Sequence, residues 1–336
     1  MGARKFEDRK ATRGRTPLLI GIVGPSGSGK TYSALRLATG MQRVVGGEIF
    51  LTDTESGRAE QYADDFTFRH TPFEAPYSPA DYLSIFEYCQ HRKASIVICD
   101  SMSHEHEGIG GVLEMHEAEV RRMAGDDYKK AEKIKLLAWS KPKQERQRLK
   151  NAILTRMGNM HFIFCFRAKE KIKLEKGEKE PIPLGWMPIS GDDYIYEMTL
   201  NMLLYPGSDG VPTWKTDMPG ERAIMKLPAQ FRNLFARSAP LSEDIGQALA
   251  SWASGARSGA FEAMASRIAN APTPAALEQL VPELKGLKVS PAELKLLREA
   301  YGERKKALEG YQLGEDEQEP EPPIDDDEPP LQEAAL

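Results

Sequence analysis

The sequence predicts an α/β protein built on a mainly parallel sheet, and three observations support this fold class. Short, nearly uninterrupted apolar runs occur from Thr16 to about Arg237, and such runs are typical of parallel strands covered on both faces. Longer amphipathic segments alternate with these runs, as the helical crossovers of a parallel sheet require. The chain has 336 residues, 40% hydrophobic and 28% charged, which suffices for a substantial buried core.

Each expected element follows from its own stretch of sequence. The expected strands are the apolar runs at 18–24 (LLIGIVG), 48–53 (EIFLTD), 95–100 (SIVICD), 161–166 (HFIFCF) and 198–205 (MTLNMLLY). The expected helices are the amphipathic segments between these runs, at 30–42, 77–92, 111–123 and 141–158. The strand-helix order therefore repeats along the region 16–237, which we expect to form one α/β domain.

The two ends of the chain differ from this region. Residues 238–312 show helical patterns with Pro and Ser starts and no strand signal, which predicts a small helical domain. Residues 313–336 carry ten acidic groups, no Lys or Arg and many prolines, so we expect a disordered tail. Residues 1–15, with six basic groups against two acidic ones, read as a flexible basic arm. Without the tail the net charge changes from −5 to +5, an asymmetry common among nucleic-acid-related proteins, although an acidic tail also simply aids solubility.

The octapeptide GPSGSGKT at 24–31 matches the phosphate-binding pattern G-x-x-x-x-G-K-[ST] in full, between an apolar run and a helical one. Its N–H groups and the following helix N-terminus attract phosphate. Lys30 is expected to reach the β- and γ-phosphates and Thr31 to ligate Mg²⁺. A dinucleotide site is disfavoured, because it would need G-x-G-x-x-G without the lysine. The expected ATP-binding residues are Gly24, Pro25, Ser26, Gly27, Ser28, Gly29, Lys30, Thr31 and Tyr32.

A phosphate loop of this kind needs a second carboxylate at the end of a neighbouring strand, which holds Mg²⁺ through water. The run SIVICD ends in Asp100 and supplies one. In isolation Asp100 would be a polar residue that closes a core strand. Beside the phosphate loop, we expect it to be a metal ligand together with Thr31.

The stretch DTESGRAEQY adds a third element, because it follows the run EIFLTD between the other two strands. A strand ending Asp-x-Glu in this position resembles the RecA-like recombinase ATPases. The resemblance covers about residues 16–235. It implies that Glu55 is the catalytic base that orients the attacking water and that Asp53 is its structural neighbour, a role that in-line attack on a γ-phosphate requires.

The strand HFIFCF is followed by R-x-K-E-K, which resembles more closely the phage-encoded RecA-like ATPases of the AAA type. Some of those act as single-strand annealing recombinases. RecA itself usually has Gln or Asn at this sensor position, whereas this chain has Arg167, a cation that could contact the γ-phosphate directly as a catalytic residue. Lys169 and Lys171 could instead reach a nucleotide held by a neighbouring subunit of a ring or filament. A solvated basic strand end remains the alternative for all three.

The resemblance also implies binding of single-stranded DNA, through loops that follow the strands expected at 95–100 and 161–166. It places them at 103–140 and 169–193, both polar and expected to be mobile. Residues 121–156 are dense in cations with Tyr128 and Trp139 interleaved, which suits a DNA-facing surface or the solvated face of an amphipathic helix.

The expected function is therefore Mg²⁺-dependent ATP hydrolysis coupled to single-stranded DNA binding, in phage-type recombination, annealing or repair. A replicative helicase or helicase loader is one alternative, and a nucleotide-gated scaffold that binds protein partners is another. The possible partners also include further copies of the chain, in a ring or filament, and a protein that binds the acidic tail.

The histidines, the cysteines and the absence of long apolar segments say less about function than these motifs do. His104 and His106, with His116 further along, could hold a metal, but no third ligand has convincing spacing; a contact of Glu105 or His104 near the nucleotide is the better reading. The cysteines Cys89, Cys99 and Cys165 lie in apolar or helical settings without C-x-x-C spacing and read as structural. We expect no membrane span and no secretory signal, which predicts a cytoplasmic protein, in the host cytoplasm if phage-encoded.

Overall fold

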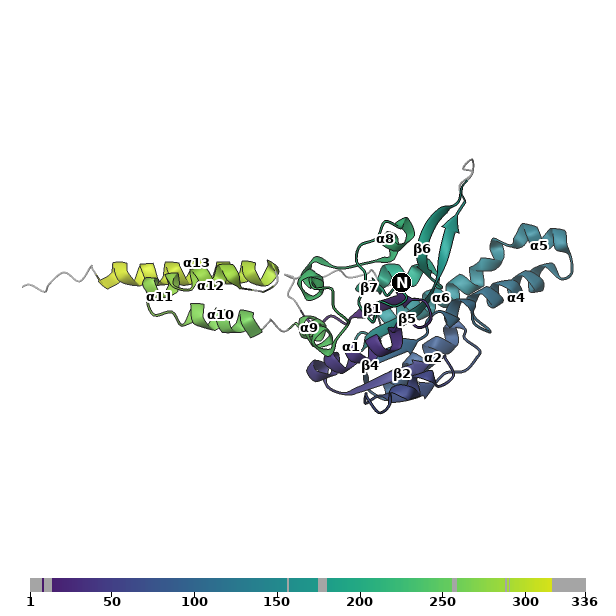
Figure 1. The fold of residues 1–336 in the computed structure, drawn as a ribbon, viewed down its shortest axis with the longest axis horizontal. Helices are drawn as coiled ribbons and strands as arrows, with labels where there is room; N and C mark the ends of the chain where they lie inside the picture. Colours follow the sequence, from purple (N-terminus) through teal and green to yellow (C-terminus); the bar gives the residue numbers. More distant parts are fainter. Residues whose placement is uncertain are drawn as a thin grey trace, which may run out of the picture. The chain divides into compact units, whose positions relative to one another are not determined.

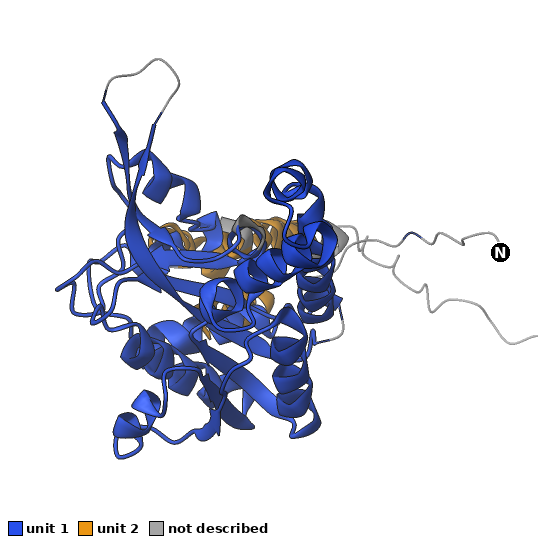
Figure 2. Cartoon of the chain, turned by 90° about the vertical axis from the view of Figure 1, so that its right-hand side faces the viewer, with its two compact units in different colours: residues 1–256 blue, residues 257–336 orange. Residues whose placement is uncertain are grey.

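The computed structural model describes residues 8, 14–155, 157–174, 180–255, 259–287, 289 and 291–315. The chain divides into two compact units, residues 1–256 and 257–336 (Figure 2). Most of the expected basic arm (1–15) and acidic tail (313–336) lies outside the described residues, so both stay predictions. Among the described helices, none combines the length and the apolar character needed to cross a membrane.

The first unit is an α/β domain with a seven-stranded, mainly parallel sheet, which confirms the predicted fold class at this level (Figure 1). Its parallel strands lie in the order β3, β2, β4, β5, β1, β7, and β6 pairs antiparallel with β5. The strand bounds are β1 Leu19–Gly24, β2 Glu48–Asp53, β3 Arg69–Pro72, β4 Ala94–Asp100, β5 His161–Lys173, β6 Ile182–Pro188 and β7 Leu200–Leu203. The short edge strand β3 and the strand β6 are absent from the predicted elements, because neither is an apolar run.

Helices cover both faces of the sheet, so successive strand residues are buried on opposite sides. On one face Val97 and Phe162 pack with residues of α2 and α6. On the other face Ile98 and Ile163 pack with residues of α1 and α9. These two cores explain why the central strands are apolar without alternation. The covering helices are α1 Lys30–Val45, α2 Pro79–His91, α6 Ser140–Thr155 and α9 Glu243–Ala253.

The expectation that 103–140 and 169–193 are loops is wrong for most of the described residues. The first segment forms short helices, and only part of the second connects elements. Within the first segment, the amphipathic pattern at 111–123 also predicts a helix, and this prediction is confirmed by α4. The remaining elements are α3 His104–Glu107, α4 Val112–Ala124, α5 Tyr128–Ile134, α7 Asp192–Glu197, α8 Pro219–Ile224 and the 3-10 turns η1 Arg58–Tyr62, η2 Leu137–Trp139 and η3 Ala229–Phe235.

Strand β5 is seven residues longer than the apolar run that predicts it. Its first half lies inside the sheet, and from Ala168 onward it pairs with β6. The resulting hairpin stands out from the rest of the unit in both views (Figures 1 and 2). Residues 169–173 are exposed, which explains why the apolar pattern ends where the strand leaves the sheet.

Helix α9 belongs to the first unit, although the sequence places it in the helical domain that begins at 238. It packs against α1 at very short range: a Cβ on Gly40 would lie 1.8 Å from the carbonyl oxygen of Glu243, and one on Gly246 would lie 2.1 Å from that of Leu37. Arg36 also donates two hydrogen bonds to Glu243, at 2.9 and 2.7 Å. This packing places the end of the first unit at 256.

The second unit is helical in its described residues. Its core gathers one face of each helix, with Phe261, Ile268, Leu277 and Leu297 almost fully buried. Thr273 caps one helix by accepting a hydrogen bond from the N–H of Ala276, as residues of its type do at helix starts. The helices are α10 Gly259–Ala269, α11 Pro274–Glu278, α12 Val281–Gly286 and α13 Pro291–Glu315.

Candidate functional site

A cavity of about 520 Å³ opens at the carboxyl ends of the parallel strands. Ligands of open α/β sheets bind at this edge. The cavity brings together the loop after β1, the start of α1, the turn after β2, the end of β4 and the middle of β5. Its lining includes Ser26, Gly27, Gly29, Lys30, Thr31, Asp53, Glu55, Arg58, Tyr62, Asp100, Glu107 and Arg167.

The loop between β1 and α1 has the conformation that its glycines permit. Gly27 and Gly29 have φ angles of 76° and 83°, in the left-handed region that favours glycine. Gly24 is also required, since a Cβ there would lie 2.7 Å from the carbonyl oxygen of Leu204. Among the described residues, no side chain caps the start of α1, so its first N–H groups are free to bind an anion.

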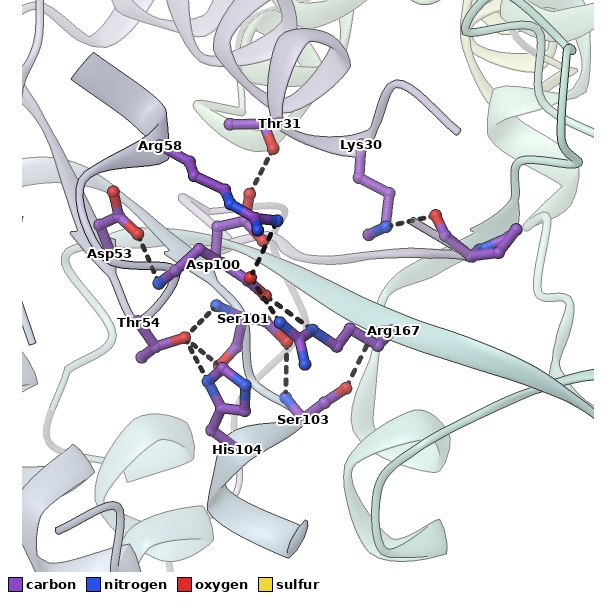
Figure 3. Close-up of polar contacts among 12 residues, drawn as sticks. Lys30, Thr31, Asp53, Thr54, Arg58, Asp100, Ser101, Ser103, His104 and Arg167 are labelled. Carbon is purple, nitrogen blue, oxygen red and sulfur yellow. Dashed lines mark hydrogen bonds and ion pairs between the residues drawn. The ribbon is translucent and has the colours of Figure 1, made fainter. Parts of the chain in front are cut away.

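Lys30 and Thr31 start α1 and reach opposite parts of the site (Figure 3). The Lys30 ammonium donates a hydrogen bond to the carbonyl oxygen of Pro25, at 2.7 Å. Burial lowers the pKa of Lys30, while neighbouring acidic groups that include Asp100 and Glu55 oppose this change. Both side chains therefore enter the cavity from the first turn of the helix.

Asp100 ends β4 inside the domain, with only 6% of its surface exposed. It accepts a hydrogen bond from the Thr31 hydroxyl. Burial raises the pKa of the Asp100 carboxyl, and the hydrogen bond from Thr31 and the charge of Lys30 oppose this rise. A buried carboxylate next to a hydroxyl is a set of hard oxygen donors.

Asp53 organises the turn that carries Glu55. Its carboxylate accepts hydrogen bonds from the N–H of Glu55 at 2.6 Å and from the N–H of Ala59 at 3.1 Å. The ring of His70 on β3 lies 3.0 Å from the same carboxylate. Asp53 is only 2% exposed, so it supports the turn while Glu55 faces the cavity.

Arg167 and Glu55 form an ion pair with two hydrogen bonds. The Nε of Arg167 donates to Oε1 of Glu55 at 2.7 Å, and an Nη donates to the other oxygen. The hydrogen bond that Arg167 donates to Glu55 raises the pKa of Arg167, and burial opposes this effect. Arg58 lies 3.8 Å from Glu55, but its side chain is 73% exposed. The expected base and the expected sensor are thus in direct contact.

Three aromatic residues lie together beside the loop, and only one of them, Tyr32, belongs to the predicted site. The Tyr32 ring lies 5.8 Å from that of Tyr62 and 5.3 Å from that of Phe66. Tyr32 and Arg36 also line a second cavity of about 290 Å³ with Gly207 and neighbouring residues. The signal for Tyr62 was present in DTESGRAEQY, since an aromatic residue ends the same turn that carries Glu55.

The histidines after β4 have separate partners. His104 Nδ1 lies 2.7 Å from the hydroxyl of Thr54, next to Glu55, whereas His106 Nδ1 lies 3.1 Å from Arg146. Glu105 pairs with Arg146 at 2.8 Å in the interior and is not part of the cavity lining, so it does not reach the cavity directly. The described residues contain no group of three or more His, Cys, Asp or Glu side chains that could hold a metal ion.

Neither a scan of protein-family models nor a search of curated proteins finds a match for the chain. A loop with free N–H groups, a lysine and a buried carboxylate can hold polyphosphate and a divalent cation. A second carboxylate in the same cavity can orient water.

Proposed function

We propose that the protein is a Mg²⁺-dependent ATPase of RecA-like type. The observation that supports this most is the meeting of three sequence elements in one cavity: the loop ending in Lys30, the turn carrying Glu55 and the strand ending in Asp100. These elements lie far apart in the sequence, and each supplies a different part of phosphate hydrolysis. The strand order and the resemblance to RecA-like ATPases support the same conclusion.

The residues present fit Mg²⁺ and a nucleotide. Mg²⁺ usually keeps several waters and takes one or two protein oxygens plus phosphate oxygens, so Thr31 and Asp100 suffice without a larger cluster of protein ligands. The N–H groups at the start of α1 suit the phosphates. The rings of Tyr32 and Tyr62 beside the loop suit the base of the nucleotide.

In the reaction, bound Mg²⁺ would neutralise charge on the phosphates. Lys30 would exchange the carbonyl of Pro25 for a phosphate oxygen, a change of partner for one flexible side chain. Glu55 would orient the attacking water and accept its proton. Asp53 would keep Glu55 in place through the backbone N–H that it already binds.

We further propose that ATP hydrolysis is coupled to single-stranded DNA, for recombination, annealing or repair. The support is the β5–β6 hairpin, where Lys169 and Lys171 are exposed on the same strand that carries Arg167. Alternate residues of a strand lie on one face, so these lysines and Lys173 form a row of cations. Such a row can bind a phosphate backbone without sequence preference.

The test is the ATPase rate with and without single-stranded DNA. Glu55→Gln keeps the shape of the side chain and removes the base, so we expect ATP to bind and turnover to fall by roughly 100-fold or more. Glu60→Gln is the matched control, because Glu60 lies on the same turn, is 67% exposed and does not line the cavity. Unchanged turnover in Glu55→Gln would reject the assigned base.

The DNA part has its own test. Replacing Lys169 and Lys171 together by alanine should weaken single-stranded DNA binding and lower the slope of log affinity against log salt by about 1.4, or ~0.7 per phosphate contact. Absence of DNA binding by the wild-type protein at low salt would reject the coupling and leave the ATPase proposal intact.

A further inference from the structure

In the candidate site, the side chains proposed to act on the nucleotide bind one another or the loop. Lys30 donates to Pro25, Thr31 donates to Asp100, and Arg167 pairs with Glu55 (Figure 3). The last contact differs from the other two, because it joins two side chains with separate roles in the proposed reaction. Glu55 needs free oxygens to orient water, and both are occupied by the guanidinium.

The main chain of Arg167 is held in place on both sides. Its N–H donates to the hydroxyl of Ser103 at 2.9 Å, and its carbonyl accepts from the N–H of Ile189 at 2.7 Å. In the sheet, Arg167 is paired with Gly24, the first residue of the phosphate loop. The side chain is therefore the part that can change partner, and it starts next to the place where phosphate would bind.

A guanidinium fork binds a carboxylate and a phosphate in the same two-bond geometry. The edge formed by Nε and one Nη, which holds Glu55, cannot bind both in that way at once. A terminal phosphate carries more negative charge than one carboxylate, so it can compete for Arg167. The side chains of Arg167 and Glu55 are 38% and 15% exposed, so the pair is accessible from the cavity while its acid partner is largely shielded from solvent.

We propose that Arg167 holds Glu55 inactive until the third phosphate of a nucleoside triphosphate takes the guanidinium from it. A diphosphate, which lacks that group, leaves the pair closed. Arg167 is then the residue that distinguishes triphosphate from diphosphate, and the exchange releases the base only when there is a bond to cleave. This inference rests on the proposed ATPase function and adds the control of its base.

The test is a double-mutant cycle read by calorimetric binding of a non-hydrolysable ATP analogue and of ADP, both with Mg²⁺. The proteins are wild type, Glu55→Gln, Arg167→Ala and the double variant. We expect Arg167→Ala to lower the affinity ratio of triphosphate to diphosphate about tenfold, since a hydrogen bond to a charged group contributes this much or more. ADP affinity should stay within about twofold in all four proteins, which also reports that each variant is folded.

The sign of the coupling decides between release of the pair and simple repulsion. If Arg167 must leave Glu55, Glu55→Gln tightens triphosphate binding about tenfold more when Arg167 is present than when it is absent. If Glu55 only repels the third phosphate and Arg167 stays paired, the gain is equal or larger without Arg167. That second outcome would overturn the inference.

A spectroscopic readout follows the arginine itself. The Nε–H resonance of Arg167, identified by its loss in Arg167→Ala, should shift with the triphosphate analogue and stay in place with ADP. Arg58→Ala tests the rival cation, because Arg58 also lines the cavity and approaches Glu55 but is mostly exposed; its affinity ratio should fall less than that of Arg167→Ala. A larger change in Arg58→Ala than in Arg167→Ala would overturn the assignment.

The proposed ATPase function and the proposed control of Glu55 by Arg167 can fail separately. If the wild-type protein binds neither nucleotide, the proposed function fails and the inference fails with it. If both nucleotides bind and the coupling has the opposite sign or is absent, only the inference fails.

Discussion

The close contact between α1 and α9 makes Gly40→Ala a sharp test of the packing around the site. At an exposed position inside a helix, a Gly→Ala change stabilises the folded protein, because alanine favours the helix by roughly 1 kcal/mol over glycine. Here the added methyl would lie 1.8 Å from the carbonyl oxygen of Glu243 and 2.5 Å from its carbonyl carbon. Ordinary contact begins at 3.4 Å, so the gap is at least 1.6 Å too small.

Both atoms in the clash belong to the backbone of α9, so no side chain can turn away and the helix must move. Overpacking of this kind costs about 1–3 kcal/mol. At the upper end of that range, less the helix preference, the net loss is about 2 kcal/mol. For a unit of this size, a loss of about 2 kcal/mol lowers the Tm by roughly 4–8 °C.

Thermal unfolding followed by tryptophan fluorescence is the assay, since all four tryptophans lie in residues 1–256. Gly158→Ala is the control in the same unit, because a Cβ there would meet nothing within 4 Å; its Tm should stay unchanged or rise slightly. A Gly40→Ala protein as stable as the wild type would refute the close contact between α1 and α9.

Two further predictions concern the metal and pH. Asp100→Asn keeps an acceptor for Thr31 and removes the buried charge. We therefore expect the affinity for ATP with Mg²⁺ to fall about tenfold or more, while the Tm does not fall. If ATP titrations of the wild type and the variant depend equally on Mg²⁺, Asp100 is not a Mg²⁺ ligand. Burial lowers the pKa of His161 to about 4, and its neutral ring accepts the N–H of Leu18 at 3.1 Å. Because the unfolded chain takes up the proton first, near an ordinary pKa of about 6.5, stability is lost as pH falls from there toward 4, by about 2 kcal/mol at pH 5. His161→Asn should remove this part of the loss in denaturant titrations at pH 7.5 and 5; an unchanged loss would show that another group causes it.

Much of the first unit could be predicted from local patterns. The runs at 48–53, 95–100 and 161–166 lie in strands of the sheet, and the run at 18–24 does so except for its first residue, since a strand buried on both faces is apolar at every position. The helices that cover the sheet have one apolar face and were predicted for the same reason. The strands β3 and β6 were not predicted, because an exposed edge strand and a hairpin outside the sheet bury too little to need an apolar run.

In the candidate site too, the sequence predicts some features and leaves others to the fold. Lys30, Thr31, Glu55, Asp100 and Arg167 were named from motifs or resemblance, and the parallel order of the strands brings them to one cavity. Local sequence carries each residue's chemistry and its place at a strand end, because strand and helix patterns depend on neighbouring residues.

Which side chains touch is decided by the fold alone. The pairing of Arg167 with Glu55 joins residues 112 positions apart, and the attachment of α9 to α1 joins residues 207 positions apart. Such contacts depend on strand order and on the closeness that two glycines allow, and no local pattern contains either. The sequence therefore carries the residues of the candidate site by itself, while the tertiary structure decides that Glu55 is paired with Arg167.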